Sequence, residues 1–130
     1  MTPNPVASMA LPYGLPDFAA ISAEDWQAAL LDGMAQQLTE LDAIATDATP
    51  PTAENVLDAW ERSGQLLSRA AMGFWTLKEA DTTDALDAIE EEMSPKLAAH
   101  NDAIMLDRRL YGVWCQTWSR TIAENPSVAA

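Results

Sequence analysis

Apolar side chains recur every three or four residues over most of this chain, and that spacing restricts it to helices. The period begins after Ser22 and continues to Ile122 in a sequence of 130 residues. Positions three and four apart share one face of an α-helix, whereas a strand alternates every second residue. No β-hairpin signal and no internal repeat interrupts the pattern. We therefore expect an all-α fold, an antiparallel bundle of about four helices.

The first two helices have clear start and stop signals. Ser22 is a suitable N-cap for a helix over about residues 23–46, and Thr49-Pro50-Pro51 ends it because a residue before proline is pushed out of the α region. Thr52 caps a second helix, expected over about residues 53–78. The inward face of the first helix is expected to comprise Trp26, Leu30, Met34, Leu38, Leu41 and Ile44.

Two glycines lie inside the second helix, although glycine lowers helix stability by about 1 kcal/mol relative to alanine. Gly64 and Gly73 are therefore expected where a neighbouring helix approaches closely. Asp81-Thr82-Thr83 begins a third helix, and Pro95 in its middle is expected to kink it or split it into two short segments. A last helix begins near Asp107 and ends before Asn125-Pro126.

Residues 1–21 are expected to form an extended, proline-rich N-terminal arm. Its prolines are Pro3, Pro5, Pro12 and Pro16, which oppose helix formation. Its apolar residues are Val6, Met9, Leu11, Tyr13, Leu15, Phe18 and Ile21. An arm this apolar should lie across another surface. The domain organisation is then the arm (1–21), a helical domain (22–124) and a short C-terminal tail (125–130).

The charge of the chain disfavours two classes of partner. Seven Lys and Arg residues against twenty Asp and Glu give a net charge of −13 and a pI near 4.1. Nucleic acid and anionic membrane surfaces would be repelled, and no apolar run approaches the roughly 20 residues of a spanning helix. The hydrophobic content of 48% is too high for a disordered acidic tail, so the chain should fold.

Cysteine usage and the N-terminal sequence indicate the compartment. Cys115 is the single cysteine, so no intramolecular disulfide can form. Residues 1–16 contain no Lys or Arg and lack the features of an export signal. We therefore expect a cytoplasmic protein.

Residue types that perform catalysis or bind metals are sparse. His100 is the single histidine, whereas a His-Glu-x-x-His zinc site needs two on one helix face. Consecutive helix positions diverge by about 100°, so Glu90-Glu91-Glu92 cannot converge on one cation and should form a solvated face. His100 is expected at the surface near a helix end. We predict no catalytic, cofactor-binding or metal-binding residue in this chain.

Cys115 and the five tryptophans are better explained by packing. Cys115 lies between two tryptophans on a predicted helix and should be a buried, inert thiol. Trp26 and Trp60 have the spacing of core residues. The remaining three, Trp75, Trp114 and Trp118, could lie in the core or meet a partner surface.

Several stretches of the sequence resemble one known family. They are Leu15-Pro16-Asp17-Phe18, Pro51-Thr52-Ala53-Glu54-Asn55, residues 60–69, Ala80-Asp81-Thr82 and residues 93–100. Together they are similar to the N-terminal region of the thimet oligopeptidase family of zinc metallopeptidases, in particular its bacterial peptidyl-dipeptidase and oligopeptidase A branch. The resemblance covers about residues 12–111. The following residues 112–118 depart from the family pattern.

This resemblance implies an α-helical zinc peptidase several times longer than this chain, which hydrolyses short peptides inside a deep channel. In the family, the zinc ligands and catalytic residues lie far downstream of the resembling region. The chain would be an N-terminal fragment that forms part of the channel wall, and its partner would be the missing C-terminal catalytic part. We expect the 130 residues alone to be inactive and to bind no zinc.

A different class of function remains open. The chain could be a free-standing, acidic helical interaction module without catalytic activity, associating with itself through exposed apolar surface. A structural remnant without activity is a third alternative.

Overall fold

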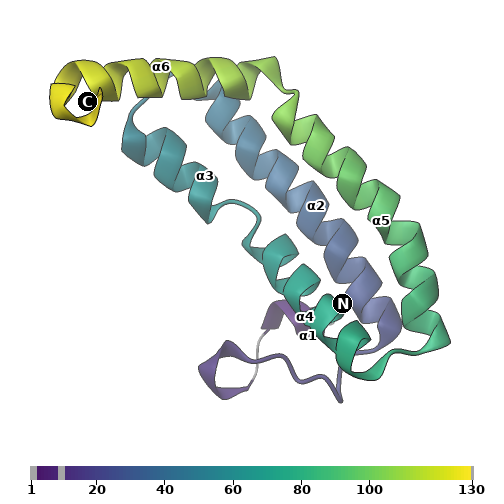
Figure 1. Ribbon diagram of the computed structural model, residues 1–130. Helices are drawn as coiled ribbons and strands as arrows, with labels where there is room; N and C mark the ends of the chain where they lie inside the picture. Colours follow the sequence, from purple (N-terminus) through teal and green to yellow (C-terminus); the bar gives the residue numbers. More distant parts are fainter. Residues whose placement is uncertain (1–2, 9–10, 130) are drawn as a thin grey trace. The chain divides into compact units, whose positions relative to one another are not determined.

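The computed structural model describes residues 3–8 and 11–129, and all their regular structure is helical (Figure 1). Its elements are α1 (Pro5–Ser8), η1 (Pro12–Gly14), α2 (Ala23–Thr46), η2 (Ala53–Asp58), α3 (Ala59–Arg62), α4 (Gln65–Asp81), α5 (Asp84–Met105), α6 (Arg108–Glu124) and η3 (Pro126–Ala129). No strand occurs among these residues. The all-α class is confirmed.

The chain forms two compact units. Unit 1 comprises Met1–Gln37 and Gly64–His100, and unit 2 comprises Leu38–Ser63 and Asn101–Ala130. Helices α2 and α5 each contribute residues to both. The helical domain expected over residues 22–124 therefore draws on both units, and each has a hydrophobic cluster of its own.

Unit 1 is built around residues from α2, α4 and α5, which run in alternating directions along the chain (Figure 1). Its buried residues are Val6, Ile21, Trp26, Ala29, Leu30, Met34, Ala70, Phe74, Leu86, Ile89 and Met93. These positions recur at helical spacing and give each helix an inward face. The core predicted for the first part of α2 is confirmed.

Three glycines allow close approach within unit 1. A Cβ on Gly73 would meet the ring of Trp26, and one on Gly64 would meet the side chain of Gln37. Both predicted contact points are therefore confirmed. Gly33 is a third point of close contact, which the sequence did not predict. A Cβ there would lie 2.6 Å from Cα of Leu67.

The N-terminal arm lies on unit 1 only in part. Val6 and Ile21 are buried in its core, and Nδ2 of Asn4 donates to the backbone oxygen of Asp25 (2.9 Å). The other described apolar residues of the arm are exposed: Leu11, Tyr13, Leu15 and Phe18. Met9 lies outside the described residues. The arm is also less extended than expected, because Pro5 and Pro12 each begin a short helical turn, where the missing N–H of proline is harmless.

Unit 2 has a smaller core, formed by Leu41, Ile44, Val56, Ile104 and Leu110. Oγ1 of Thr52 accepts from the backbone N–H of Asn55 (3.1 Å), and Oδ1 of Asn55 accepts from the backbone N–H of Thr52 (2.7 Å). This reciprocal pair confirms the cap predicted at Thr52. Leu38 was expected to face inward with the core of the first helix, but its side chain is 42% exposed.

The prediction of one continuous second helix, over about residues 53–78, is wrong. The structure ends α3 at Arg62 and begins α4 at Gln65. Between them Gly64 has φ +70°, a left-handed conformation that glycine adopts without the penalty other residues carry. The glycine therefore interrupts the helix as well as admitting a close neighbour.

The split expected at Pro95 is also wrong, because α5 continues from Asp84 to Met105 with Pro95 inside it. Proline removes one hydrogen bond, to the carbonyl of Glu91 four residues earlier. Pro95 and Glu91 are both exposed, so water can reach that side of the helix. The chain tolerates the proline there without a break.

The ends of α2 and α6 agree with the predicted boundaries. The carboxylate of Asp107 caps α6 by accepting from the backbone N–H groups of Arg109 (2.8 Å) and Leu110 (3.4 Å). None of the helices within residues 3–8 and 11–129 has the length and apolar character needed to cross a membrane.

Candidate functional site

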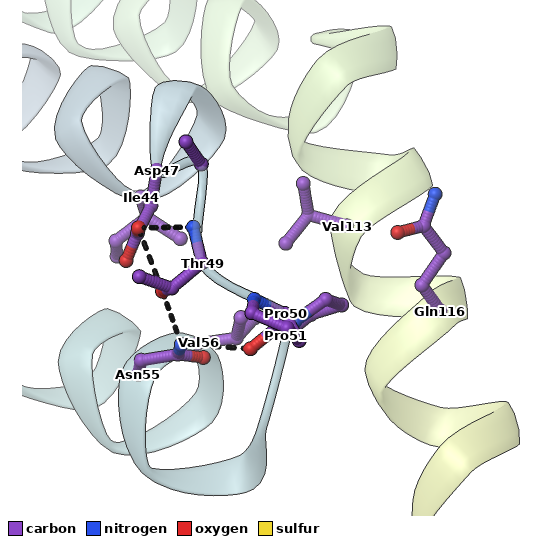
Figure 2. A pocket seen from close by; sticks show the side chains of 10 residues that line it. Ile44, Asp47, Thr49, Pro50, Pro51, Asn55, Val56, Val113 and Gln116 are labelled. Atoms are coloured by element: carbon purple, nitrogen blue, oxygen red, sulfur yellow. Dashed lines mark hydrogen bonds between the residues drawn. The ribbon is translucent and has the colours of Figure 1, made fainter.

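A pocket of about 280 Å³ in unit 2 lies where α2 ends and the chain turns toward α3 (Figure 2). Its lining residues are Ile44, Asp47, Ala48, Thr49, Pro50, Pro51, Asn55, Val56, Val113 and Gln116. Two consecutive prolines fix this turn, since proline has a restricted φ and restricts the residue before it. Val113 points toward the turn from α6, and Gln116 of the same helix also lines the pocket.

The polar groups of this pocket are engaged in holding the turn. The carboxylate of Asp47 accepts from the backbone N–H (2.9 Å) and the hydroxyl (2.7 Å) of Thr49. Nδ2 of Asn55 donates to Oγ1 of Thr49 and to the backbone oxygen of Pro50, both at 3.1 Å. The bonds from Thr49 lower the pKa of Asp47 below its usual value. The arrangement stabilises a loop and pairs no nucleophile with a base.

A second polar cluster in unit 2 surrounds Arg109. Its guanidinium binds the carboxylates of Asp42 (2.8 Å) and Asp107 (2.9 Å), and it borders a hollow of about 470 Å³ next to Leu38 and Ile104. The hydrogen bond from Arg109 lowers the pKa of Asp107. All three side chains are partly or largely exposed, so water screens both ion pairs and each contributes little to stability. The cluster ties the start of α6 to the end part of α2.

His100 differs from the prediction of a surface histidine at a helix end. It lies inside α5 and is 7% exposed, and its Nε2 donates to Oε1 of Gln37 at 2.7 Å. Burial lowers the pKa of His100 because it disfavours the charged imidazolium. Because its Nε2–H is bonded to the side-chain amide of Gln37, the imidazole of His100 has a structural role in unit 1.

Lowering the pH should therefore destabilise unit 1. The pKa of His100 is lower in the folded chain than its ordinary value of 6.5, so the unfolded chain takes up the proton first as the pH falls below that value. We expect the urea midpoint of unfolding to fall between pH 7.5 and pH 5.5. The His100→Gln variant removes the titrating group and should show a smaller change, and an equal change in both proteins would contradict the assignment.

The acidic run on α5 is divided among different partners. Glu90 pairs with Lys78, Glu91 is exposed, and Glu92 binds Lys96 (2.6 Å) and Gln27 (2.9 Å). The three carboxylates diverge as their helical spacing requires. Among residues 3–8 and 11–129, no three His, Cys, Asp or Glu side chains lie together so as to hold a metal ion. These donors do not fit a zinc site.

Cys115 is not the buried thiol that the sequence suggested. Its side chain is half-buried on α6, and a hydrogen bond with it raises the pKa of Tyr111. The prediction failed because residue 115 lies about 140–160° around the helix from Leu110 and Thr117, the buried residues of α6.

The tryptophans fall into three environments. Trp26 is fully buried, as predicted, whereas Trp60 was expected in the core and is only half-buried against the cluster of unit 2. Trp75 is also half-buried, and its ring meets Phe74 edge to face at 5.1 Å. Trp114 and Trp118 are exposed and stack on each other.

Comparison with known proteins identifies relatives along nearly all of the chain. It is 33% identical to the dipeptidyl carboxypeptidase of Escherichia coli strain K12 over 120 residues, which is 92% of this chain and 18% of that protein. It is 35% identical over 124 residues to the dipeptidyl carboxypeptidase of Salmonella typhimurium strain LT2, with the same two coverages. The similarity to the thimet oligopeptidase family is confirmed. No protein-family model matches the chain.

The chain spans about a fifth of the length of these dipeptidyl carboxypeptidases. The matched stretch is longer than the resemblance read from the sequence, which stopped at Tyr111. A match over 120 of 130 residues must include residues 11–120, so residues 112–118 lie within it. The identity over the whole stretch does not say which of its residues match, so the departure of residues 112–118 from the family pattern stays a prediction.

Proposed function

We propose that this chain is the N-terminal helical region of a zinc-dependent peptidase of the dipeptidyl carboxypeptidase type, where it forms part of the wall of the substrate channel. The observation that supports this most strongly is the 33–35% identity over 92% of the chain. The substrates of the whole enzyme would be short peptides, cleaved near the carboxyl end as the names of the relatives indicate. A cytoplasmic location would suit the single cysteine.

Within this proposal the chain supplies shape, and polypeptide outside these 130 residues supplies the zinc ligands and the bond cleavage. The single histidine of the sequence is committed to Gln37, and the described carboxylates are dispersed or paired with Lys and Arg. Close helix contacts at Gly33 and Gly73 make unit 1 a densely packed element suited to a channel wall.

Two measurements test this division of roles. The purified chain, incubated with zinc and a fluorogenic short peptide, should give no turnover under conditions in which the Escherichia coli enzyme is active. Hydrolysis that a chelator abolishes would contradict the proposal. Conversely, an Escherichia coli enzyme in which this chain replaces the matched stretch should retain chelator-sensitive release of dipeptides, and a folded but inactive chimera would count against the wall role.

A second candidate function is that of an acidic interaction module without catalytic activity. The specific observation in its favour is the pair of exposed, stacked tryptophans on α6, Trp114 and Trp118. Exposed aromatic rings that adjoin one another are typical of binding surfaces.

A further inference from the structure

We propose that one side of α6 is the surface on which the rest of the peptidase packs, namely the polypeptide of the same enzyme that lies outside these 130 residues. Three residues define this surface, named here the aromatic face: Tyr111, Trp114 and Trp118. At 100° per residue they lie within an arc of about 60° on the helix. Tyr111 is 67% exposed, Trp114 42% and Trp118 44%.

The rings of the aromatic face are already arranged for contact with a flat apolar surface. The ring centroids of Trp114 and Trp118 are 6.1 Å apart, and their planes differ by only 4°. Tryptophan and tyrosine side chains have few rotatable bonds, so they lose little conformational entropy when they are covered. Burial of their exposed area would therefore stabilise a contact without rearrangement of α6.

The charges at the two ends of α6 do not oppose burial of the aromatic face. The carboxylate of Asp107 pairs with Arg109 (2.9 Å), and that of Glu124 pairs with Arg120 (3.1 Å). Glu124 is the one acidic residue within α6 and lies about 80° or more around the helix from each ring. An apolar surface can thus cover the rings without burying an unpaired charge of this helix.

The relatives indicate what covers the aromatic face. The matched stretch is 18% of each dipeptidyl carboxypeptidase, so more than four-fifths of each relative lies outside it. In an enzyme of that length, this chain is one part among several that must pack together. This step rests on the proposed function, since it requires the chain to be the corresponding region of such an enzyme.

The small area of the aromatic face favours a partner in the same polypeptide. From the 150–250 Å² that an aromatic side chain typically buries, the exposed parts of the three rings amount to about 300 Å². A contact of about 600 Å² over both sides is well below the ~1,600 Å² of a standard interface between separate proteins, whose association also costs translational and rotational freedom. Parts of one chain are already tethered, and their interfaces begin at about 600 Å². A net charge of −13 further disfavours a second copy.

Hydroxyl-radical footprinting followed by mass spectrometry tests this inference, because exposed tryptophan and tyrosine rings are oxidised faster than covered ones. The two samples are the isolated chain and the chimera described above, the Escherichia coli enzyme in which this chain replaces the matched stretch. An added reporter peptide normalises the radical dose. Oxidation of the three rings should be at least about fourfold slower in the chimera, since the core of an interface is fully buried.

Substitutions on α6 test whether the rings themselves hold the contact. The double variant Trp114→Ala/Trp118→Ala removes most of the contact area, so Tyr111 in the chimera should be oxidised as fast as in the isolated chain. Ser119→Ala is the matched control, because Ser119 is exposed on the same helix about 80° or more from each ring. It should leave Tyr111 protected. Circular dichroism of the isolated chain would establish that both variants remain folded.

The footprint and the activity of the chimera separate this inference from the proposed function. A chimera that releases dipeptides while its three rings are oxidised as fast as in the isolated chain would overturn the inference and leave the peptidase proposal standing. Protected rings in a folded but inactive chimera would support the inference and count against the wall role. Protection of Tyr111 that the double variant leaves unchanged would also overturn the inference. A chimera that does not fold would count against both proposals, since both require this chain to replace the matched stretch.

Discussion

Replacing Trp26 by alanine is expected to lower the free energy of unfolding by about 3–5 kcal/mol, the range for a buried aromatic residue truncated to alanine. The side chain is fully buried in unit 1. Its ring packs onto Gly73, which has no side chain to move into the space, and lies 5.8 Å from the ring of Phe18. The cavity would therefore persist, and urea denaturation followed by circular dichroism would measure the loss.

Trp26→Phe is the informative control for this prediction. Nε1 of Trp26 is buried and has no hydrogen-bond partner among the described residues. Phenylalanine removes that N–H, which relieves a desolvation penalty of about 1–3 kcal/mol and offsets part of the lost ring contact. We expect a loss well below that of Trp26→Ala. Equal losses in the two variants would show that the indole nitrogen has a partner or that the ring does not fill the core.

Gly33→Ala is the second substitution expected to have a large effect. The added Cβ would lie 2.6 Å from Cα and 2.7 Å from N of Leu67, and backbone atoms cannot rotate away as a flexible side chain can. Overpacking of this kind typically costs about 1–3 kcal/mol. The higher helix propensity of alanine offsets about 1 kcal/mol of this overpacking cost. We expect a net loss of up to about 2 kcal/mol in the free energy of unfolding.

Gly112→Ala provides the comparison within the same chain. Gly112 also lies inside a helix, but no atom beyond its chain neighbours and the backbone of its own helix lies within 4 Å of the position that its Cβ would occupy. This substitution should raise the free energy of unfolding by about 0.5–1 kcal/mol through helix propensity alone. The two alanine variants should thus change stability in opposite directions, and parallel changes would refute the close packing assigned to Gly33.

Helix ends were predictable wherever a local signal was sufficient. Ser22 and Thr52 cap their helices as the sequence suggested, and α6 begins directly after Asp107 as expected, because a cap depends on neighbours two or three residues away. The break at Gly64 and the continuity through Pro95 were not predictable in this way. A glycine can lie within a helix or end one, and the residues next to Gly64 in sequence do not indicate that it adopts φ +70° between α3 and α4.

The environments of the candidate site residues depended on contacts distant in sequence. His100 is buried, and its Nε2–H donates a hydrogen bond to Oε1 of Gln37, which is 63 residues away in the sequence. Trp60 is half-buried although it packs against the cluster of unit 2, and Cys115 is half-buried on a side of α6 away from Leu110 and Thr117. The hydrogen bonds of Asn55 could have been suspected, since an amide three residues after a threonine N-cap is typical of a capping box.

The ends of the two segments of unit 1 have a consequence for how this fold is connected. The side chain of Gln37, where the first segment stops, touches both Gly64, where the second begins, and His100, where it stops. One short linker could therefore join residue 37 to residue 64 without stretching the backbone. With such a linker, unit 1 would be a continuous three-helix chain, and residues 38–63 are in this sense an insertion between its two segments.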